Sequence, residues 1–324
     1  MMILSAKDQE SLIDMKEVLA HVSVALNEFS ANKTDTPIRL ALPFGEGSSG
    51  LVMPSVAEGL ETMGLKYVTV VPTNKEIGKK TINGVVFLSD AKTGEPLALL
   101  EGSYLTQIRT GALSGVATDH LARKDAKILG IIGTGEQSKG LCEAVLAVRD
   151  IEAIYVFNRS KDKAEKFAEY ATEKFGKEVI ICTDSNEVVR QADVLVTSTN
   201  AMEPVFSEAL RPGIHVNAVG SFRPDMQELP SSALSSANKV VVEAVDAALE
   251  ETGDLQFPIK EGVFSEEDLH GELGKIVNGE VKGRESDEEI TIFKSVGLAI
   301  VDIVVAKYLY DKAVKNNVGV QVDL

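Results

Sequence analysis

The chain has 324 residues, of which 44% are hydrophobic and 25% charged, values typical of a folded globular protein. Its formal net charge of −16 argues against nucleic-acid binding, because a protein that neutralises phosphates needs a basic face. The sequence shows no apolar run of about 18 residues and no charged-then-apolar leader, so we expect a cytoplasmic protein that does not span a membrane.

The two cysteines and four histidines show no spacing that is typical of a metal site. Cys142 and Cys182 lie in apolar segments, and we expect them to be reduced core residues. The histidines are scattered along the chain. We therefore expect no bound metal.

The first part of the chain predicts an α+β domain. Ser5 and Asp8 have the spacing of a capping box, and apolar residues from Leu12 to Phe29 recur at helical intervals, which predicts one helix. Between about residues 38 and 100, short β-like runs alternate with turns rich in Gly, Pro and Asn. The segments SDAKTGEP and TINGV are interpreted as hairpin connections, so the runs predict an antiparallel sheet.

A different pattern begins near Lys127, where predicted strands alternate with helices as far as the run KVVVEA. This alternation implies right-handed crossovers and an α/β fold with a Rossmann-like, doubly wound parallel sheet. The apolar stretch at about 290–315 predicts a final helix that returns to the first domain. We expect residues 1–118, completed by a helix at about 300–324, to form the first domain and 119–299 the Rossmann domain.

A glycine turn after the first Rossmann strand indicates a dinucleotide site. The segment GTGEQS carries the first two glycines of the G-x-G-x-x-G/A motif, with Ser138 in the third place. Gly133 allows the tight turn and Gly135 lets a pyrophosphate approach the backbone. The following helix start, which includes Glu136 and Gln137, offers free N–H groups and a positive dipole end.

The end of the second Rossmann strand indicates which dinucleotide binds. NAD-binding units usually place Asp or Glu there to hold the ribose 2′-hydroxyl. This chain has Asn158, Arg159 and Ser160, which can donate hydrogen bonds to a 2′-phosphate that a carboxylate would repel. A solvated helix start, capped by Asn158 or Ser160, is the alternative. We favour NADP(H) as the cofactor, with NAD(H) as the alternative.

Four segments occur in order along the chain: EGSYLTQIRTGALSGVATDHLA, ILGIIGTGEQS, VNAVGSFRPDMQELP and ITIFKSVGLAIVDIVVA. Together they closely resemble the ornithine cyclodeaminase/mu-crystallin family, over essentially the whole chain. That family includes ornithine and lysine cyclodeaminases, an archaeal-type alanine dehydrogenase, cyclic ketimine reductases and opine-type dehydrogenases. The resemblance implies a homodimer built through the sheet of the first domain, which is then the substrate-binding and dimerisation domain.

The resemblance also implies a basic site for the substrate carboxylate, made by Arg39 in TPIRL, Lys66 in GLKYV and Arg109 in QIRTGA. A guanidinium matches a carboxylate through two parallel hydrogen bonds. We expect Arg109 and Thr110 at a helix start, near the carboxylate or the cofactor phosphates. Lys66 is also the candidate acid/base, because nearby arginines would lower its pKa. Without the resemblance, Arg39 and Lys66 could be ordinary surface residues.

Further positions match cofactor contacts of the family. Thr199 and Asn200 follow the fourth Rossmann strand, and Val219 follows the next strand in NAVGS. Ser295 in FKSVG matches a residue that closes over the nicotinamide end. Each of these four could instead be an ordinary cap or turn residue.

One departure from the family concerns the chemistry. Ornithine cyclodeaminases place an aspartate shortly after the glycine turn, where this chain has Phe222. The next acid, Asp225, is a candidate catalytic residue, or it forms with Glu228 a capping arrangement for a short helix. Arg223 is a weaker candidate for an anion or cofactor contact.

We therefore expect an NAD(P)H-dependent reductase of a small cyclic or α-imino acid, such as 1-pyrroline-2-carboxylate, or a related amino-acid dehydrogenase. An ornithine or lysine cyclodeaminase that uses bound NAD⁺ is the first alternative. A non-catalytic protein of mu-crystallin type, which binds NADPH or a small ligand, is the second.

Overall fold

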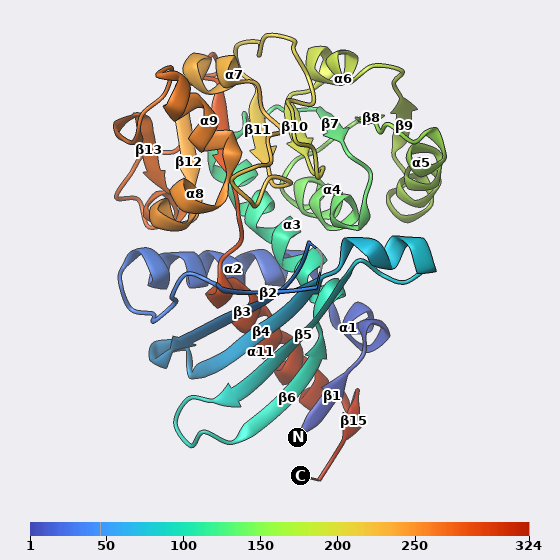
Figure 1. Cartoon of the computed structure of the whole chain (residues 1–324), viewed down its shortest axis with the longest axis vertical. Helices are drawn as coiled ribbons and strands as arrows, with labels where there is room; N and C mark the ends of the chain where they lie inside the picture. The colour runs from blue at the N-terminus through green and yellow to red at the C-terminus, as the bar shows by residue number, and fades with distance from the viewer. Residues whose placement is uncertain (46, 324) are drawn as a thin grey trace. The chain divides into compact units, whose positions relative to one another are not determined.

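The computed structural model describes residues 1–45 and 47–323, and it divides into two units (Figure 1). The first unit comprises Met1–Arg109 together with the C-terminal segment from Leu298, and the second comprises Thr110–Gly297. The first break falls inside a helix, earlier than the boundary at 118/119 suggested by the sequence. Within the described ranges, no helix is long and apolar enough to cross a membrane.

The first unit is built on a seven-stranded sheet in the order β15-β1-β6-β5-β4-β3-β2. Neighbouring strands are antiparallel except for the parallel pair β1 and β6. The strands are β1 (Met2–Leu4), β2 (Leu40–Phe44), β3 (Ser48–Ala57), β4 (Thr62–Val70), β5 (Ile82–Asp90), β6 (Pro96–Glu101) and β15 (Val320–Gln321). The short 3₁₀ helices η1 (Glu58–Leu60) and η2 (Pro72–Ile77) flank β4.

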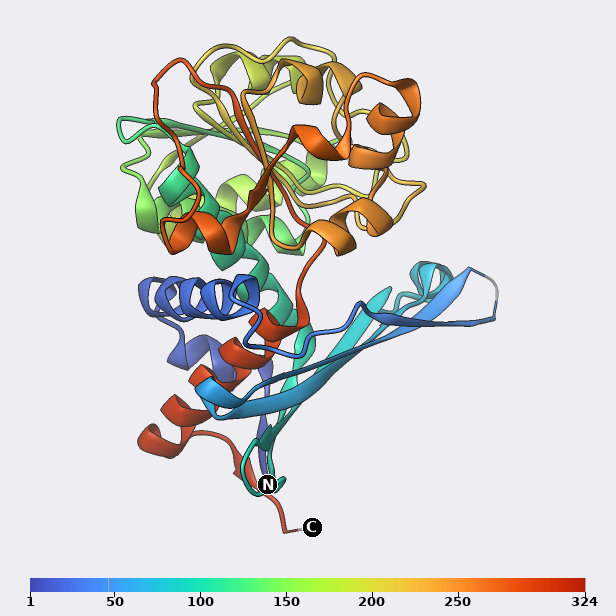
Figure 2. The ribbon, with the colours of Figure 1, turned by 90° about the vertical axis from the view of Figure 1, so that its left-hand side faces the viewer.

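Helices cover one face of this sheet. The long helix α11 (Ala299–Asn316) packs on β3, β4 and β5 and against α2 (Met15–Ser30). Figure 2 shows α2 and α11 on the same side of the sheet. Because α11 is apolar along most of its length, it buries a long stripe of the core of the first unit.

The helix predicted at the start of the chain is two helices. The capping box of Ser5 and Asp8 is confirmed at the start of α1 (Ala6–Leu12). The chain then leaves the helical conformation at Ile13, and Asp14 caps α2 by accepting the backbone N–H groups of Lys16 and Glu17. A side-chain cap inside a continuous apolar pattern therefore divides the predicted helix.

The predicted hairpins differ in outcome. The segment SDAKTGEP does connect β5 to the antiparallel β6. The segment TINGV is not a turn, because η2 makes the connection from β4 and TINGV runs into β5.

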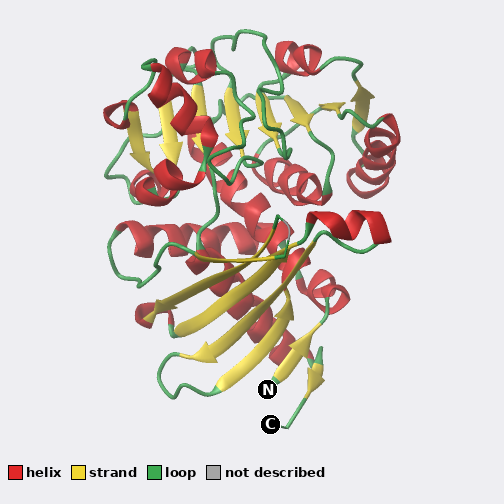
Figure 3. Ribbon diagram, viewed as in Figure 1, coloured by secondary structure: helices red, strands yellow, loops and turns green. Residues whose placement is uncertain are grey.

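The second unit contains the predicted doubly wound sheet, with eight parallel strands in the order β13-β12-β14-β11-β10-β7-β8-β9 (Figure 3). The strands are β7 (Ile128–Ile132), β8 (Ala153–Phe157), β9 (Glu178–Ile181), β10 (Val194–Thr197), β11 (His215–Ala218), β12 (Lys239–Val242), β13 (Leu269–Glu272) and β14 (Thr291–Lys294). The strand order reverses between β7 and β10, which is where such folds bind ligands.

Short helices connect these strands. They are α4 (Glu136–Val148), α5 (Lys161–Phe175), α6 (Ser185–Gln191), α7 (Ser231–Ser236), α8 (Val245–Glu251), α9 (Gly253–Glu261), η3 (Glu266–Asp268) and α10 (Leu273–Val277). Two hydrophobic clusters fill the space between these helices and the sheet.

The prediction of one final helix at 290–315 is wrong in its first part. Residues Thr291–Lys294 instead form β14, whose β-branched and aromatic residues favour a strand, and β14 lies between β11 and β12 in the sheet.

Helix α3 (Gly102–Leu121) follows β6 directly. The Glu101 carboxylate accepts the backbone N–H groups of Ser103 and Tyr104 and so satisfies the first turn of the helix. The expectation that Arg109 and Thr110 stand at a helix start is therefore wrong, because both lie in the middle of α3. A helix dipole cannot assist them there.

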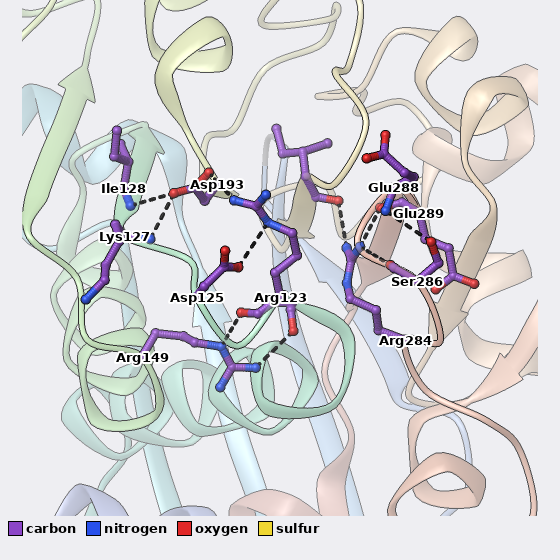
Figure 4. A network of polar contacts seen from close by, with 12 residues as sticks. Arg123, Asp125, Lys127, Ile128, Arg149, Asp193, Arg284, Ser286, Glu288 and Glu289 are labelled. Atoms are coloured by element: carbon purple, nitrogen blue, oxygen red, sulfur yellow. Dashed lines mark hydrogen bonds and ion pairs between the residues drawn. The ribbon is translucent and has the colours of Figure 1, made fainter.

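A charged network closes the amino-terminal edge of the parallel sheet (Figure 4). The Asp193 carboxylate, which precedes β10, accepts hydrogen bonds from Arg123 (2.9 Å) and Arg211 (2.7 Å). Its other oxygen accepts the backbone N–H groups of Lys127 (2.8 Å) and Ile128 (3.0 Å) at the start of β7. One buried carboxylate with four donors thus fixes the starts of two neighbouring strands.

Candidate active site

A buried cluster of three charged residues lies in the first unit. Lys66 on β4, Arg109 on α3 and Asp302 on α11 are only 3%, 6% and 0% exposed. Asp302 Oδ1 accepts hydrogen bonds from Lys66 Nζ and from Arg109 Nε, each at 3.0 Å. The structure thus brings together two of the three basic residues predicted to bind the substrate carboxylate, and it gives them a common acid.

Lys66 and Arg109 have more N–H donors than Asp302 accepts. Arg109 uses only Nε on Asp302, and no partner of its Nη groups is seen among the residues that the structure describes. Lys66 uses one of its three N–H groups in the same way. Two cations share one carboxylate, so the cluster carries a formal positive charge in a buried place. This arrangement is suited to binding a compact anion.

Burial and nearby charges change the acidity of Lys66. Loss of hydration and the positive charges of Arg109 and Arg39 lower the pKa of Lys66 to about 8, while Asp302 opposes the shift. Arg39 lies in the loop before β2, is half-buried, and is near enough to act on Lys66 through its charge. A lysine with such a pKa can give and take protons near neutral pH.

Asp302 was not predicted from the sequence. It interrupts the apolar run AIVDIVVA, which by itself predicts only a packed helix. A single acid in the buried face of a helix must have a partner, because burying an unpaired charge is costly. That rule identifies Asp302 as an unusual residue, but only the fold identifies Lys66 and Arg109 as its partners.

The glycine turn has the geometry that a pyrophosphate requires. Gly133 adopts φ +95°, and a Cβ there would lie 2.6 Å from the Thr199 side chain, so only glycine fits. Gly135 caps α4, and the space next to its Cα is open. Thr134 Oγ1 and Gln137 Oε1 are buried polar atoms without a hydrogen-bond partner among the described residues. These features fit a dinucleotide phosphate at the start of α4.

Other residues of this turn play different parts. Ser138 is fully buried, as expected for the third position of the motif, and its hydroxyl donates to the Gly135 carbonyl. Glu136 is exposed and forms an ion pair with Lys139 at 2.9 Å. Thr110, in the middle of α3, is buried.

At the end of β8, the Asn158 side chain makes hydrogen bonds within the protein through both its oxygen and its nitrogen. Its Oδ1 accepts the Thr134 N–H at 3.2 Å, and its Nδ2 donates to the Ser160 carbonyl at 3.0 Å. Arg159 and Ser160 are exposed, and Ser160 makes no side-chain cap to α5. Asn158 therefore shapes the loop, and Arg159 and Ser160 remain the candidates for a 2′-phosphate.

The residues after β10 and β11 lie at the carboxyl edge of the sheet, as predicted. Thr199 is half-buried with its N–H bound to Glu228, and Asn200 next to it is exposed. Val219 continues the ladder by donating to the Thr197 carbonyl. Ser295 is buried after β14, and its hydroxyl donates to the buried Glu243 at 3.0 Å.

The segment around Asp225 corrects one interpretation. No helix begins at Asp225, so the predicted cap with Glu228 is wrong: residues 219–230, all of which the structure describes, contain no helix. Asp225 is exposed and forms a two-bonded ion pair with Arg223, at 3.0 and 3.1 Å. Glu228 is instead fully buried.

The parallel sheet, the glycine turn and the strand order define a dinucleotide-binding protein of the doubly wound class. The chain belongs to the ornithine cyclodeaminase/mu-crystallin family, whose model matches residues 1–317. The resemblance inferred from the four sequence segments is therefore confirmed.

Relatives of known activity resemble the chain over its whole length. A Delta(1)-pyrroline-2-carboxylate reductase of Bacillus cereus is 64% identical over 324 residues, which cover 100% of both chains. The structure of Thermococcus litoralis Delta(1)-pyrroline-2-carboxylate reductase in complex with NADH and L-proline is 42% identical, with a TM-score of 0.95 and 99% of this chain and 100% of that chain covered. An archaeal alanine dehydrogenase dimer with bound NAD is 35% identical, with a TM-score of 0.92 and coverage of 100% and 99%.

Proposed function

We propose that this protein reduces 1-pyrroline-2-carboxylate, a cyclic α-imino acid, to L-proline with a reduced nicotinamide dinucleotide. The observation that carries the proposal is the buried Lys66–Arg109–Asp302 cluster, which places guanidinium donors suited to an anion beside a lysine of lowered pKa. The same activity is the one for which the 64% identical relative is named.

Arg109 would hold the substrate through its carboxylate. Its two Nη groups can donate parallel hydrogen bonds to the two carboxylate oxygens, while Asp302 keeps Nε and the plane of the guanidinium fixed. We also assign Arg39 to the carboxylate, as the resemblance implied. Substrates without an α-carboxylate would leave this buried positive charge without a partner.

Lys66 would supply the proton. When bound, the reduced nicotinamide supplies a hydride to the imine carbon. Lys66 in its ammonium form donates a proton to the imine nitrogen, so that C=N becomes CH–NH and the lysine becomes a neutral amine. Asp302 then favours reprotonation of Lys66 from solvent, because its negative charge raises the pKa of that lysine.

We assign the dinucleotide to the glycine turn, to the loop after β8 and to the loops after β10, β11 and β14. The residues in this assignment are Arg109, Thr110, Gly133, Gly135, Glu136, Gln137, Asn158, Arg159, Ser160, Thr199, Asn200, Val219 and Ser295. At the end of β8 the chain has Asn158, Arg159 and Ser160 where NAD-binding units usually have an acid, which favours NADPH. The preference for NADPH stays a prediction. A catalytic role for Asp225 also stays a prediction.

We propose a homodimer that forms through the open face of the sheet in the first unit. Lys66 faces α11, so its neighbour Tyr67 lies on the opposite face, paired with Val85. Tyr67 and Val85 are 41% and 38% exposed, and Leu40 and Leu42 on β2 are also exposed. An apolar sheet face of this kind suits a second copy of the chain. Sedimentation should show a dimer that Tyr67→Lys converts to monomers; a wild-type monomer would contradict it.

One experiment tests the proposed activity. Purified protein is mixed with 1-pyrroline-2-carboxylate and either NADPH or NADH, and in parallel with L-ornithine and NAD⁺. The proposal predicts net oxidation of the reduced cofactor and formation of L-proline, faster with NADPH. Ammonia release from ornithine without net change of the cofactor would instead indicate a cyclodeaminase. Dinucleotide binding without turnover of either substrate would indicate a non-catalytic binding protein.

A further inference from the structure

The buried carboxylate of Glu228 collects donors from two separate loops. Oε1 accepts the backbone N–H of Thr199 at 2.6 Å. Oε2 accepts the N–H of Gly220 at 2.7 Å, the Thr197 hydroxyl at 3.0 Å and the N–H of Ser221 at 3.3 Å. Thr197 is the last residue of β10 and Thr199 follows that strand, whereas Gly220 and Ser221 follow β11. Both oxygens face only donors, which suits an ionised carboxylate.

These loops also touch each other and the glycine turn. A Cβ at Gly220 would overlap the backbone N and O atoms of Thr199, so the two loops meet without space for a side chain. The Ser198 hydroxyl donates to the Gly133 carbonyl at 2.8 Å. The loops that follow β7, β10 and β11 therefore form one contiguous edge, in which Glu228 is the acceptor shared by the last two.

Two further charged residues fix Glu228 itself. Asp254 Oδ1 accepts the backbone N–H groups of Glu228 and Leu229, at 2.7 and 2.9 Å. Asp254 Oδ2 lies 3.0 Å from Lys294 Nζ, and both side chains are almost completely buried. Burial and the charge of Asp254 raise the pKa of Glu228, and Lys294 opposes that rise. The trio of Glu228, Asp254 and Lys294 keeps a formal negative charge, which the backbone donors of the two loops offset.

The position of these loops indicates which part of a dinucleotide they meet. In a doubly wound sheet the adenosine ribose lies at the end of the second strand, here β8, and the pyrophosphate lies at the first helix, here α4. The nicotinamide half then extends over the strands on the other side of the switch point, here β10 and β11. Glu228 holds the loops that follow these two strands.

We propose that Glu228 is a positioning residue for the nicotinamide half of the dinucleotide. By holding the N–H groups of Thr199 and Gly220, it keeps the two loops at a fixed spacing, and with them Asn200 and Val219. Asp254 and Lys294 hold Glu228 in place. This inference rests on the proposed function, since it requires that the protein binds a nicotinamide dinucleotide.

The test compares binding of a whole dinucleotide with binding of its adenosine half. In Glu228→Gln one carboxylate oxygen becomes an NH₂ group, which must face a backbone N–H donor in either orientation of the amide. Calorimetry should show NADPH and NADH binding weakened by about 10-fold or more, because binding must then restore a loop spacing that a charged hydrogen bond maintains in the wild type. Binding of adenosine 2′,5′-bisphosphate and of AMP, which lack the whole nicotinamide half, should change by less than about 2-fold.

Asp193→Asn is the matched control, since Asp193 is a buried carboxylate with four donors at the opposite edge of the same sheet. It should lower the Tm without separating the affinities of the whole and half ligands. Gly220→Ala is the second variant, for use if Glu228→Gln does not fold. Its Cβ would overlap backbone atoms of Thr199 and Glu228 Oε1, so it separates the loops from each other and from the carboxylate without removing a charge. It should produce the same selective loss.

The outcomes separate the inference from the proposed function. A Glu228→Gln or Gly220→Ala protein that binds both ligands as the wild type does, or loses both equally, would overturn the positioning role. A wild-type protein that binds neither NADPH nor NADH would overturn the proposed function and, with it, this inference.

Discussion

Two buried clusters, one in each unit, use similar residues with opposite balance of charge. In the first, Lys66 and Arg109 share the single carboxylate of Asp302, so a positive charge remains. In the second, Lys294 pairs with Asp254 while Glu228 adds another carboxylate, so a negative charge remains. Neither is explained by stability alone, because a buried ion pair is often no better than apolar residues of similar size.

The two clusters differ in whether the groups that carry the surplus charge have hydrogen-bond partners within the protein. The surplus positive charge has guanidinium and ammonium N–H groups that no described residue occupies, so it is available to an anion from outside. In the second cluster, the Glu228 carboxylate already accepts hydrogen bonds from backbone N–H groups and from the Thr197 hydroxyl. This difference supports the two proposals made above, that the first cluster binds the substrate anion and that the second holds two loops in place.

The largest expected effect follows from removing the titratable group of the first cluster. Lys66→Met should lower kcat for imine reduction by about 10²- to 10⁴-fold, the usual contribution of a general acid. Steady-state kinetics of the variant measure this, and the Kd of NADPH, determined by calorimetry, should stay near the wild-type value. Full turnover with only a raised KM would show that Lys66 binds substrate but moves no proton.

A somewhat smaller effect is expected from changing the shape of the cation. Arg109→Lys keeps the charge but cannot make two parallel hydrogen bonds, so kcat/KM should fall by roughly 100-fold, mostly through KM. The control is inhibition by L-proline compared with pyrrolidine, which lacks the carboxylate. The variant should lose most of the preference for L-proline. If inhibition by L-proline and inhibition by pyrrolidine weaken equally, Arg109 does not bind the carboxylate.

The smallest effect is a displacement of the pH profile. Asp302 raises the pKa of Lys66, so Asp302→Asn should lower that pKa from about 8. Reduction needs protonated Lys66, so the reduction rate falls as the pH rises through the pKa of that lysine. In Asp302→Asn the midpoint of this alkaline fall should lie about one pH unit lower. Asp254→Asn, the equivalent change in the second cluster, should leave the limb in place. An upward or absent shift in Asp302→Asn would refute the coupling.

Much of the architecture could be predicted because it depends on local patterns. Alternating strands and helices, with a glycine turn after the first strand, were sufficient for the parallel sheet and the dinucleotide motif. The apolar pattern predicts the wrong element at two places, where a few residues decide between a continuous helix and another structure. Asp14 caps a new helix inside an apolar stretch, and the β-branched residues before Lys294 make a strand where a long helix was expected.

The charged clusters were predicted only in part. The resemblance implies roles for Lys66 and Arg109, but Asp302 and Lys294 each stand alone in an apolar run, which predicts only a packed element. Their partners lie far away in the sequence, so no spacing rule finds them. The spacing of Glu228 to Asp225 predicts a helix cap, whereas the donors to Glu228 come from the ends of two strands, β10 and β11.

The most direct test of the central claim follows the hydrogen itself. The protein is incubated with 1-pyrroline-2-carboxylate and NADPH that carries deuterium at the transferable position of the nicotinamide, and the proline is examined by mass spectrometry and NMR. Our account predicts one deuterium at Cα of L-proline for each NADPH oxidised. Proline without deuterium, or oxidation of NADPH without proline, would contradict it.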